Sequence, residues 1–293
     1  MRRPTRLSEY VGQSRIRPIL ELELKTGSLR PTLLYGGAGL GKSALASAIT
    51  GELGKNTQLH EFVASKSWTD DFIIDMLMGL SIEGYDSKGI PGPNAVRHTI
   101  YVDECSELTN LSILRPIEDG HVYDRSGHPN WLPEINWIFS TNLPEKCTSA
   151  FMNRMKLQLH LYPYSVKEIE DIITFNFPDM PKGTVENIAK RGKGNPRMSL
   201  SYAESVALYN GDSDKFFSLM GIDERGLDDR DREYLRILGD ASRPMSLNSM
   251  SSALQESTAI VRMMENHLIF LGLVQIGGTG RSLIAQAGRG KRG

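Results

Sequence analysis

A glycine-rich run beginning at Gly36 reads Gly-Gly-Ala-Gly-Leu-Gly-Lys-Ser and matches the phosphate-binding pattern GxxxxGK[ST]. Glycines let backbone N–H groups curl around phosphate oxygens, and the N-terminus of a following helix favours negative charge. We expect Lys42 to reach the β- and γ-phosphates of ATP, and the Ser43 hydroxyl to bind Mg²⁺. The residues that we assign to this half of the site are Gly36, Gly39, Gly41, Lys42, Ser43 and, on the same helix, Leu45.

Two adjacent carboxylates, Asp103 and Glu104, follow the apolar run Ile-Tyr-Val. In open α/β sheets, ligands bind at the carboxyl ends of the strands. We expect Asp103 to hold Mg²⁺ through water, and Glu104 to orient and deprotonate the water that attacks ATP. An acidic strand end is common on any surface, but its pairing with a phosphate loop favours the catalytic interpretation.

The elements that must position these residues fall into three blocks. Residues 1–162 alternate apolar strand-like runs with amphipathic helices, which predicts an α/β domain with a mostly parallel sheet. Residues 163–225 have the pattern of a small helical lid domain. Residues 226–293 predict three helices and a glycine-tipped hairpin, the order of a winged helix. The expected strands include Thr32–Tyr35, and the runs 99–102 and 135–139.

The winged-helix block is basic at its end. Ser246 and Ser257 are expected to cap its second and third helices. After Glu265 the chain has no acidic residue, so we predict contacts with the DNA backbone, which attracts cations regardless of sequence. The predicted DNA-binding residues are Arg281, Arg289, Lys291 and Arg292. A basic tail that only aids solubility is the alternative, and the third helix offers Arg262 and His267 at most for base readout.

Composition excludes several other classes. The chain has 293 residues and a formal net charge of -1, with no apolar run long enough for a membrane span and no signal-peptide pattern. We therefore expect a cytoplasmic protein without a membrane partner, in which Cys105 and Cys147 are reduced thiols. Six histidines are scattered without a metal-ligand spacing.

The order of these motifs resembles the RuvB family of AAA+ ATPases. The opening run Arg-Pro-Thr-Arg-Leu-Ser-Glu-Tyr-Val-Gly-Gln, the phosphate loop, Asp103-Glu104, the run Leu-Arg-Pro-Ile-Glu-Asp and the run Gly-Asn-Pro-Arg occur in the RuvB order. The resemblance covers nearly the whole chain. It implies an ATP-driven, ring-forming DNA translocase, hexameric, that acts on Holliday junctions or other duplex DNA in recombination and repair.

The resemblance also implies further site residues. Tyr10 and Val11 match the adenine pocket, with Pro196 on its other side. Asn142 matches sensor 1, a polar group that touches the γ-phosphate or its water, although a register shift of one residue would make it Thr141.

Two arginines complete the set implied by the resemblance. Arg154 matches the arginine finger, which reaches the γ-phosphate of the neighbouring subunit. The family usually has a second arginine nearby, where this chain has Met152, so a solvated surface arginine is the alternative. Arg197 matches sensor 2, which touches the same phosphate from the lid of its own subunit.

The chain departs from RuvB at two loops. Between Asp119 and Ile135 it is shorter, and the hairpin that grips RuvA in that family has a polar tip here. A RuvA-type partner is therefore in doubt, and another junction-binding or loading protein is possible. The hairpin could contact DNA through Arg125 and His128, or be a plain surface turn. Residues 81–97 form either a channel or partner loop, or an inert insertion.

Two rival functions share the same ATP site. An AAA+ clamp loader or helicase loader would use it to remodel a protein on DNA, but clamp loaders usually end in a helical collar. A nucleotide-gated DNA-binding scaffold would hydrolyse ATP slowly or not at all.

Overall fold

The computed structural model describes residues 2–86 and 89–284, and divides the chain into two compact units between Tyr162 and Pro163. The first unit contains a five-stranded parallel sheet with the strand order β2-β3-β6-β1-β7. Its elements are α1 (Arg17–Leu24), β1 (Thr32–Tyr35), α2 (Lys42–Glu52), β2 (Thr57–Val63), α3 (Asp70–Met78), β3 (Arg97–Asp103), η1 (Cys105–Glu107), α4 (Leu114–Asp119), β4 (His121–Tyr123), β5 (Pro129–Trp131), β6 (Ile135–Thr141), η2 (Pro144–Lys146), α5 (Ser149–Met152) and β7 (Leu157–His160).

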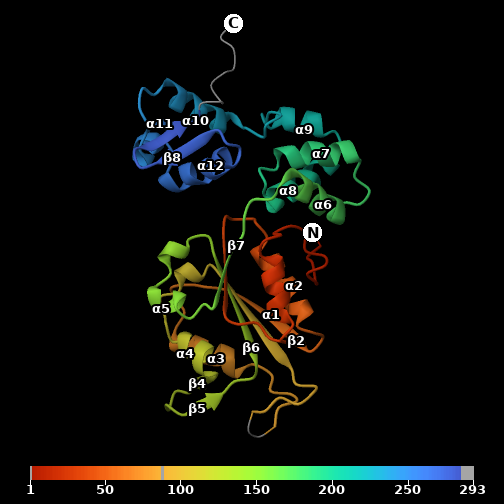
Figure 1. Ribbon diagram of the computed structural model, residues 1–293, viewed down its shortest axis with the longest axis vertical. Coiled ribbons are helices and arrows are strands. Elements are labelled where there is room, and N and C mark those ends of the chain that lie inside the picture. The colour runs from red at the N-terminus through yellow and green to blue at the C-terminus, as the bar shows by residue number, and fades with distance from the viewer. Residues whose placement is uncertain (1, 87–88, 285–293) are drawn as a thin grey trace. The chain divides into compact units, whose positions relative to one another are not determined.

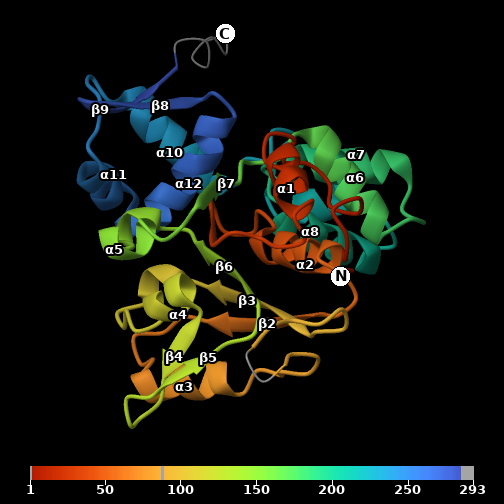
Figure 2. The same cartoon turned by 60° about the horizontal axis from the view of Figure 1, so that its bottom comes forward.

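Helices cover both faces of this sheet. Helix α2 contacts β2, β3 and β6, while α3, α4 and the β4–β5 hairpin lie on the other side (Figures 1 and 2). Alternate side chains of each strand point to opposite faces, so every second residue of β3 joins the core beneath α3 and α4. That core includes Leu33, Ile73, Leu77, Ile100, Val102, Ile113, Leu114 and Phe139.

The parallel register brings three strand ends to one edge. Leu34 of β1 is paired with Ser140 of β6, and Val102 of β3 with Phe139 of β6. The phosphate loop after β1, the acidic pair at the end of β3 and Asn142 after β6 therefore lie at the same carboxyl edge. This confirms the predicted parallel-sheet α/β domain.

The second unit is helical except for a small hairpin. Its elements are α6 (Val166–Asn176), α7 (Lys182–Arg191), α8 (Pro196–Leu208), α9 (Ser213–Leu219), α10 (Asp229–Asp240), α11 (Leu247–Leu254), α12 (Thr258–Phe270), β8 (Val274–Gly277) and β9 (Gly280–Leu283). Ser246 and Ser257 accept hydrogen bonds from Ser249 N and Ile260 N, as predicted for the N-caps of α11 and α12. Three helices followed by an antiparallel β8–β9 hairpin confirm the predicted winged helix (Figure 1).

No helix within residues 2–86 and 89–284 combines the length and apolar character that crossing a bilayer requires.

A histidine lies inside the winged helix without a hydrogen-bond partner. His267 of α12 is 7% exposed, and neither ring nitrogen has a partner among the described residues. Burial, together with the nearby Lys193 charge, lowers the pKa of His267 from 6.5 to about 3, although Asp228 and Asp223 act in the opposite direction. His267 is therefore neutral at neutral pH and faces the core. Its burial leaves little of the His267 ring exposed for base readout.

Acid should destabilise the protein partly through this side chain. Because the folded pKa of His267 lies below its unfolded value, its neutral form contributes stability that is complete above about pH 6.5 and declines toward about pH 3. Between about pH 6.5 and 5.5 the contribution should fall by about 1 kcal/mol. We predict that His267→Leu loses about 1 kcal/mol less free energy of unfolding over this interval than the unchanged protein.

Urea unfolding at the two pH values measures this difference. His128→Leu is the matched control, because the His128 side chain is 78% exposed. Equal pH slopes for His267→Leu and the unchanged protein would show that His267 does not contribute.

Candidate nucleotide-binding and catalytic site

The phosphate loop has a backbone that glycine makes possible. Gly36, Gly39 and Gly41 have φ angles of 146°, 80° and 86°. A Cβ on Gly36 would lie 2.5 Å from the carbonyl oxygen of Leu161, so no larger residue fits there. The loop leaves β1 and enters α2 at Lys42, which is the strand–loop–helix context that the sequence predicted.

Lys42 is buried, and its ammonium group has specific partners. The Nζ atom donates to the carbonyl oxygens of Gly36 at 2.9 Å and Gly37 at 3.1 Å, and to Oδ1 of Asn142 at 2.5 Å. A buried cation is costly unless it is hydrogen-bonded, so these acceptors fix its place inside the loop. The Leu45 side chain, by contrast, is packed in the core at 1% exposure, and its role at the nucleotide stays a prediction.

Asn142 connects the lysine to the predicted catalytic base. Its Nδ2 atom donates to Oε1 of Glu104 at 3.3 Å, while its Oδ1 accepts from Lys42. Glu104 has a left-handed backbone with φ 54°, a conformation that side chains other than glycine rarely adopt and that clusters at active sites. The structure thus brings Lys42, Asn142 and Glu104 together from three separate segments.

Asp103 is held by the neighbouring strand. Its Oδ1 atom accepts from the Glu104 backbone N–H at 3.0 Å and from the Ser140 hydroxyl, which is also 2.8 Å from the Tyr101 hydroxyl. Burial raises the pKa of Tyr101, so its hydroxyl stays protonated. The carboxylate therefore keeps a fixed orientation. Sequence reasoning missed Ser140, whose signal is a polar residue inside the buried strand β6.

The structure separates the two candidates for sensor 1. The Thr141 hydroxyl donates to Ser106 Oγ at 2.9 Å and accepts from the Leu143 backbone at 3.0 Å. Thr141 is fully buried and shapes the turn, whereas the Asn142 amide contacts both site residues. This geometry favours Asn142.

The N-terminal segment is joined to the end of the first unit. Tyr10 is buried, and Val11 is partly buried. The side chain of Gln13 donates to the Tyr162 carbonyl at 2.7 Å and accepts from the Tyr162 N–H at 3.1 Å. This two-way bond fixes the backbone that follows Tyr10 and Val11. Sequence reasoning did not single out Gln13, although it belongs to the opening run that carries the resemblance.

Arg154 lies just beyond α5 with its guanidinium partly exposed. Nη2 forms an ion pair with Glu118 of α4 at 2.9 Å, and Nη1 donates to the Ala150 carbonyl at 2.9 Å. Its buried Nε has no hydrogen-bond partner among the described residues, and the side chain is 31% exposed. Two of its donor groups are thus already held within the chain, and one edge faces solvent.

In the second unit, Pro196 is the buried first residue of α8, and Asn195 caps this helix by accepting from Met198 N at 3.2 Å. The next residue, Arg197, is exposed.

Of the basic residues predicted to bind DNA, Arg281 lies within the described part of the chain. Arg281 is paired with the buried Glu265 at 2.5 Å, and its side chain is only 12% exposed. Its guanidinium is thus held within the winged helix by Glu265, and the predicted DNA contact of Arg281 stays a prediction. The sequence placed it past a glycine tip but could not show that an acidic partner lies beneath it. Arg289, Lys291 and Arg292 lie outside the described residues.

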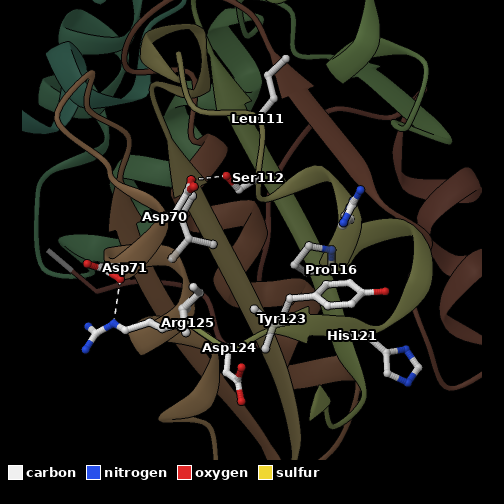
Figure 3. A pocket seen from close by; sticks show the side chains of 13 residues that line it. Asp70, Asp71, Leu111, Ser112, Pro116, His121, Tyr123, Asp124 and Arg125 are labelled. Atoms are coloured by element: carbon white, nitrogen blue, oxygen red, sulfur yellow. Dashed lines mark hydrogen bonds and ion pairs between the residues drawn. The ribbon is translucent and has the colours of Figure 1, made fainter. Parts of the chain in front are cut away.

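The short hairpin and α3 border a cavity of about 610 Å³ (Figure 3). Arg125 at the hairpin tip pairs with Asp71 at 2.8 Å and Asp75 at 3.5 Å, and Ser112 donates to Asp70. Asp71 and Asp75 partly cancel the positive charge that Arg125 could offer to DNA. None of the predicted nucleotide-site residues lines this cavity.

The long loop after α3 packs onto the same hairpin. The Tyr85 ring lies 5.7 Å from that of Trp131, and its hydroxyl accepts from the Glu134 N–H at 2.8 Å. Its role as a channel or partner loop stays a prediction.

Cys105 and Cys147 are free thiols whose sulfurs are 4.0 Å apart.

Two family models match the chain. The model of the Holliday junction DNA helicase RuvB P-loop domain matches residues 2–79, and that of the RuvB C-terminal winged helix domain matches residues 224–289. The RuvB subunit of the Holliday junction branch migration complex of Paracoccus denitrificans is 27% identical, over 96% of this chain and 87% of the relative. That of Campylobacter fetus is 26% identical, over 96% and 86%.

Solved structures agree in fold. The chain is similar to the RuvB branch migration motor of Thermotoga maritima, with a TM-score of 0.75 and 23% identity over 97% of this chain and 96% of the other. A variant of that protein gives a TM-score of 0.78 at 24% identity, with the same coverage. The similarity therefore extends over both units of the chain.

The contacts of Asn142 generate a prediction that separates it from its neighbour. Asn142→Ala should lower ATP turnover by about 100-fold, the usual scale for one preorganised polar group at the reacting atoms. Thr141→Val removes a hydroxyl that contacts Ser106 and the Leu143 backbone but neither Lys42 nor Glu104, so it should reduce turnover far less. Steady-state ATPase rates of both variants measure the difference, with unfolding temperatures as the control. A larger loss in Thr141→Val would assign sensor 1 to Thr141.

Proposed function

We propose that this chain, a RuvB-like AAA+ ATPase, hydrolyses ATP and uses the energy to move duplex DNA. The observation that carries the proposal is the network that joins Lys42 of the phosphate loop to Asn142 and Glu104, in a chain that also has a winged helix. The relatives that match nearly the whole chain are described as subunits of a Holliday junction branch migration complex. We infer the same class of substrate here, a Holliday junction or other duplex DNA in recombination and repair.

The site fits ATP with Mg²⁺. The backbone around Gly36, Gly39 and Gly41 would hold the phosphates, and the Lys42 ammonium would bind the β- and γ-phosphates. Ser43 and Asp103 offer oxygen atoms, the ligands that Mg²⁺ prefers. Among the described residues no cluster of three or more His, Cys, Asp or Glu side chains could hold a metal alone. Mg²⁺ usually completes its shell with phosphate and water.

Hydrolysis needs a positioned water and a base. Glu104 would accept a proton from the attacking water, and Asn142, which already contacts Glu104, would orient that water against the γ-phosphate. The rigid support of Asp103 by Ser140 would keep the metal ligand in place during the reaction.

The remaining nucleotide contacts rest on the resemblance. Tyr10, Val11 and Pro196 would border the adenine, and Arg197 would touch the γ-phosphate. The two-way bond of Gln13 supports the first part, because it fixes the chain next to Tyr10 and Val11.

The proposed active form is a hexameric ring. In such a ring Arg154 would leave Glu118 and bind the γ-phosphate of the neighbouring subunit, where a guanidinium stabilises charge spread over phosphate oxygens. Hydrolysis would then depend on assembly.

For DNA contact we propose the basic residues Arg281, Arg289, Lys291 and Arg292, of which Arg281 also pairs with Glu265. Because the hairpin is short and polar, we propose that a junction-binding or loading protein other than a RuvA-type partner recruits this chain. Of the rival functions, a clamp loader is disfavoured by the winged helix.

The first experiment compares ATPase rates without DNA, with linear duplex and with a synthetic four-way junction, at low and physiological salt. A translocase should be stimulated by duplex or junction, and the stimulation should weaken as salt rises, because salt competes for backbone contacts. Glu104→Gln is the control and should bind ATP and DNA without turnover. An ATPase rate that is the same with and without each DNA would instead favour a loader or remodeller.

A second experiment tests the ring. Arg154→Ala should leave ATP binding intact and lower turnover by about 1000-fold or more, the scale of an arginine finger. Mixing Arg154→Ala with Lys42→Ala subunits should restore some hydrolysis, because each Arg154→Ala nucleotide site can then receive an intact arginine from a Lys42→Ala neighbour. If Arg154→Ala turns over ATP at the unchanged rate, the assignment is wrong.

A further inference from the structure

The loop that leads to Arg197 has one defined backbone shape. Residues 192–195, called the lid loop below, connect α7 to α8, whose second residue is Arg197. Lys193 has φ 54° and Gly194 has φ 62°. A Cβ on Gly194 would lie 2.8 Å from the Tyr164 carbonyl oxygen, so the loop fits closely against the start of the second unit. A movement of this loop must therefore move Arg197 with it.

The lid loop is fixed to the winged helix by a buried ion pair. Lys193 Nζ lies 2.5 Å from Asp231 Oδ2 and 3.5 Å from Asp228 Oδ2. The side chains of Lys193 and Asp231 are 13% and 2% exposed, so water screens this pair little. The neighbouring His267 is neutral and adds no competing charge.

The two carboxylates stand at the start of α10, Asp228 as its N-cap and Asp231 in its first turn. Asp228 accepts from the Asp231 N–H at 2.9 Å, and Asp231 accepts from the Asp228 N–H at 3.3 Å, which forms a capping box. Lys193 therefore contacts the groups that define where α10 begins and how it is oriented.

A second polar cluster joins α10 to the β8–β9 hairpin, called the wing below. Tyr234 lies one turn after Asp231 and donates to Glu265 Oε1 of α12 at 2.9 Å. Glu265 also accepts from Arg281 Nε of β9 at 2.5 Å and from Nη2 at 3.2 Å. The two clusters share α10, so polar contacts lead from the lid loop to the wing.

We propose that Lys193 is a positioning residue that couples the loop presenting Arg197 to the wing, through Asp231, α10 and the Tyr234–Glu265–Arg281 cluster. The inference rests on the proposed function for the role of Arg197 at the nucleotide. Binding of ATP and contact of the wing with DNA then influence one another, because coupling between two sites is reciprocal. Arg281 acts in this cluster through its contact with Glu265.

The test uses the full chain and a double variant. Lys193→Met alone leaves Asp231 buried without its cation, which destabilises the fold. Lys193→Met with Asp231→Asn removes both charges and keeps the volumes similar. Lys182→Met is the matched control, because Lys182 also lies in the lid, on α7, and its side chain is 90% exposed. Thermal unfolding confirms that each variant is folded.

The main readout is hydrogen–deuterium exchange of the wing, with and without ATPγS. In the unchanged protein and in Lys182→Met, ATPγS should change exchange at β8 and β9 as well as protect the phosphate loop. In the double variant the phosphate loop should still be protected, but the change at the wing should be lost. The effect of ATPγS on the Kd for a DNA duplex should fall from about fivefold or more to nearly none.

The outcomes separate this inference from the proposed function. A wing response that persists in the folded double variant, or that is missing in the unchanged protein although ATPγS protects the phosphate loop, would overturn the coupling role of Lys193. If the wing response depends on Lys193 but DNA does not change the ATPase rate, the coupling is supported and the translocase proposal is contradicted. Failure of ATPγS to protect the phosphate loop would overturn both.

Discussion

The charge of Lys42 is the constraint on which the first unit depends. An ammonium group taken out of water must find acceptors in the protein, and Lys42 finds them in two loop carbonyls and the Asn142 amide. These acceptors belong to chain segments a hundred residues apart. They meet because β1 and β6 are adjacent and parallel, and because β3 delivers Glu104 from the next position in the sheet. A one-residue slip in the β6 register would turn Asn142 away and leave the cation without this partner.

The parts of the site that could be predicted from sequence are those whose signal is local. The phosphate loop is a contiguous pattern, and the acidic pair follows a continuous apolar run. The strand and helix periodicity around them was sufficient for the parallel-sheet domain and the winged helix, since Ser246 and Ser257 cap the helices that the pattern predicted. Asn142 required the resemblance, because its neighbour Thr141 is equally polar and only the direction of each side chain separates them.

What could not be predicted depends on pairs that are distant in sequence. The charge of Arg281 predicts a DNA contact, but the sequence does not show that its guanidinium pairs with the buried Glu265. Gln13 and Ser140 carry no charge and follow no motif, and each acquires a role from a partner elsewhere in the chain, Tyr162 and Asp103 respectively. Arg154 is intermediate, since the resemblance suggests a role between subunits and the structure adds the acidic partner, Glu118, that it would have to leave.

The ion pairs of this protein differ in what they can do. Exposed pairs such as Arg125–Asp71 are screened by water and contribute little to stability. Lys193–Asp231 and Arg281–Glu265 are shielded, and the cost of removing their charges from water offsets much of their attraction. Their main effect is therefore on geometry, because a shielded charge tolerates few arrangements other than contact with its partner. Two such pairs meet one face of α10, through Asp231 and Tyr234, and would transmit a displacement of the lid loop to the wing.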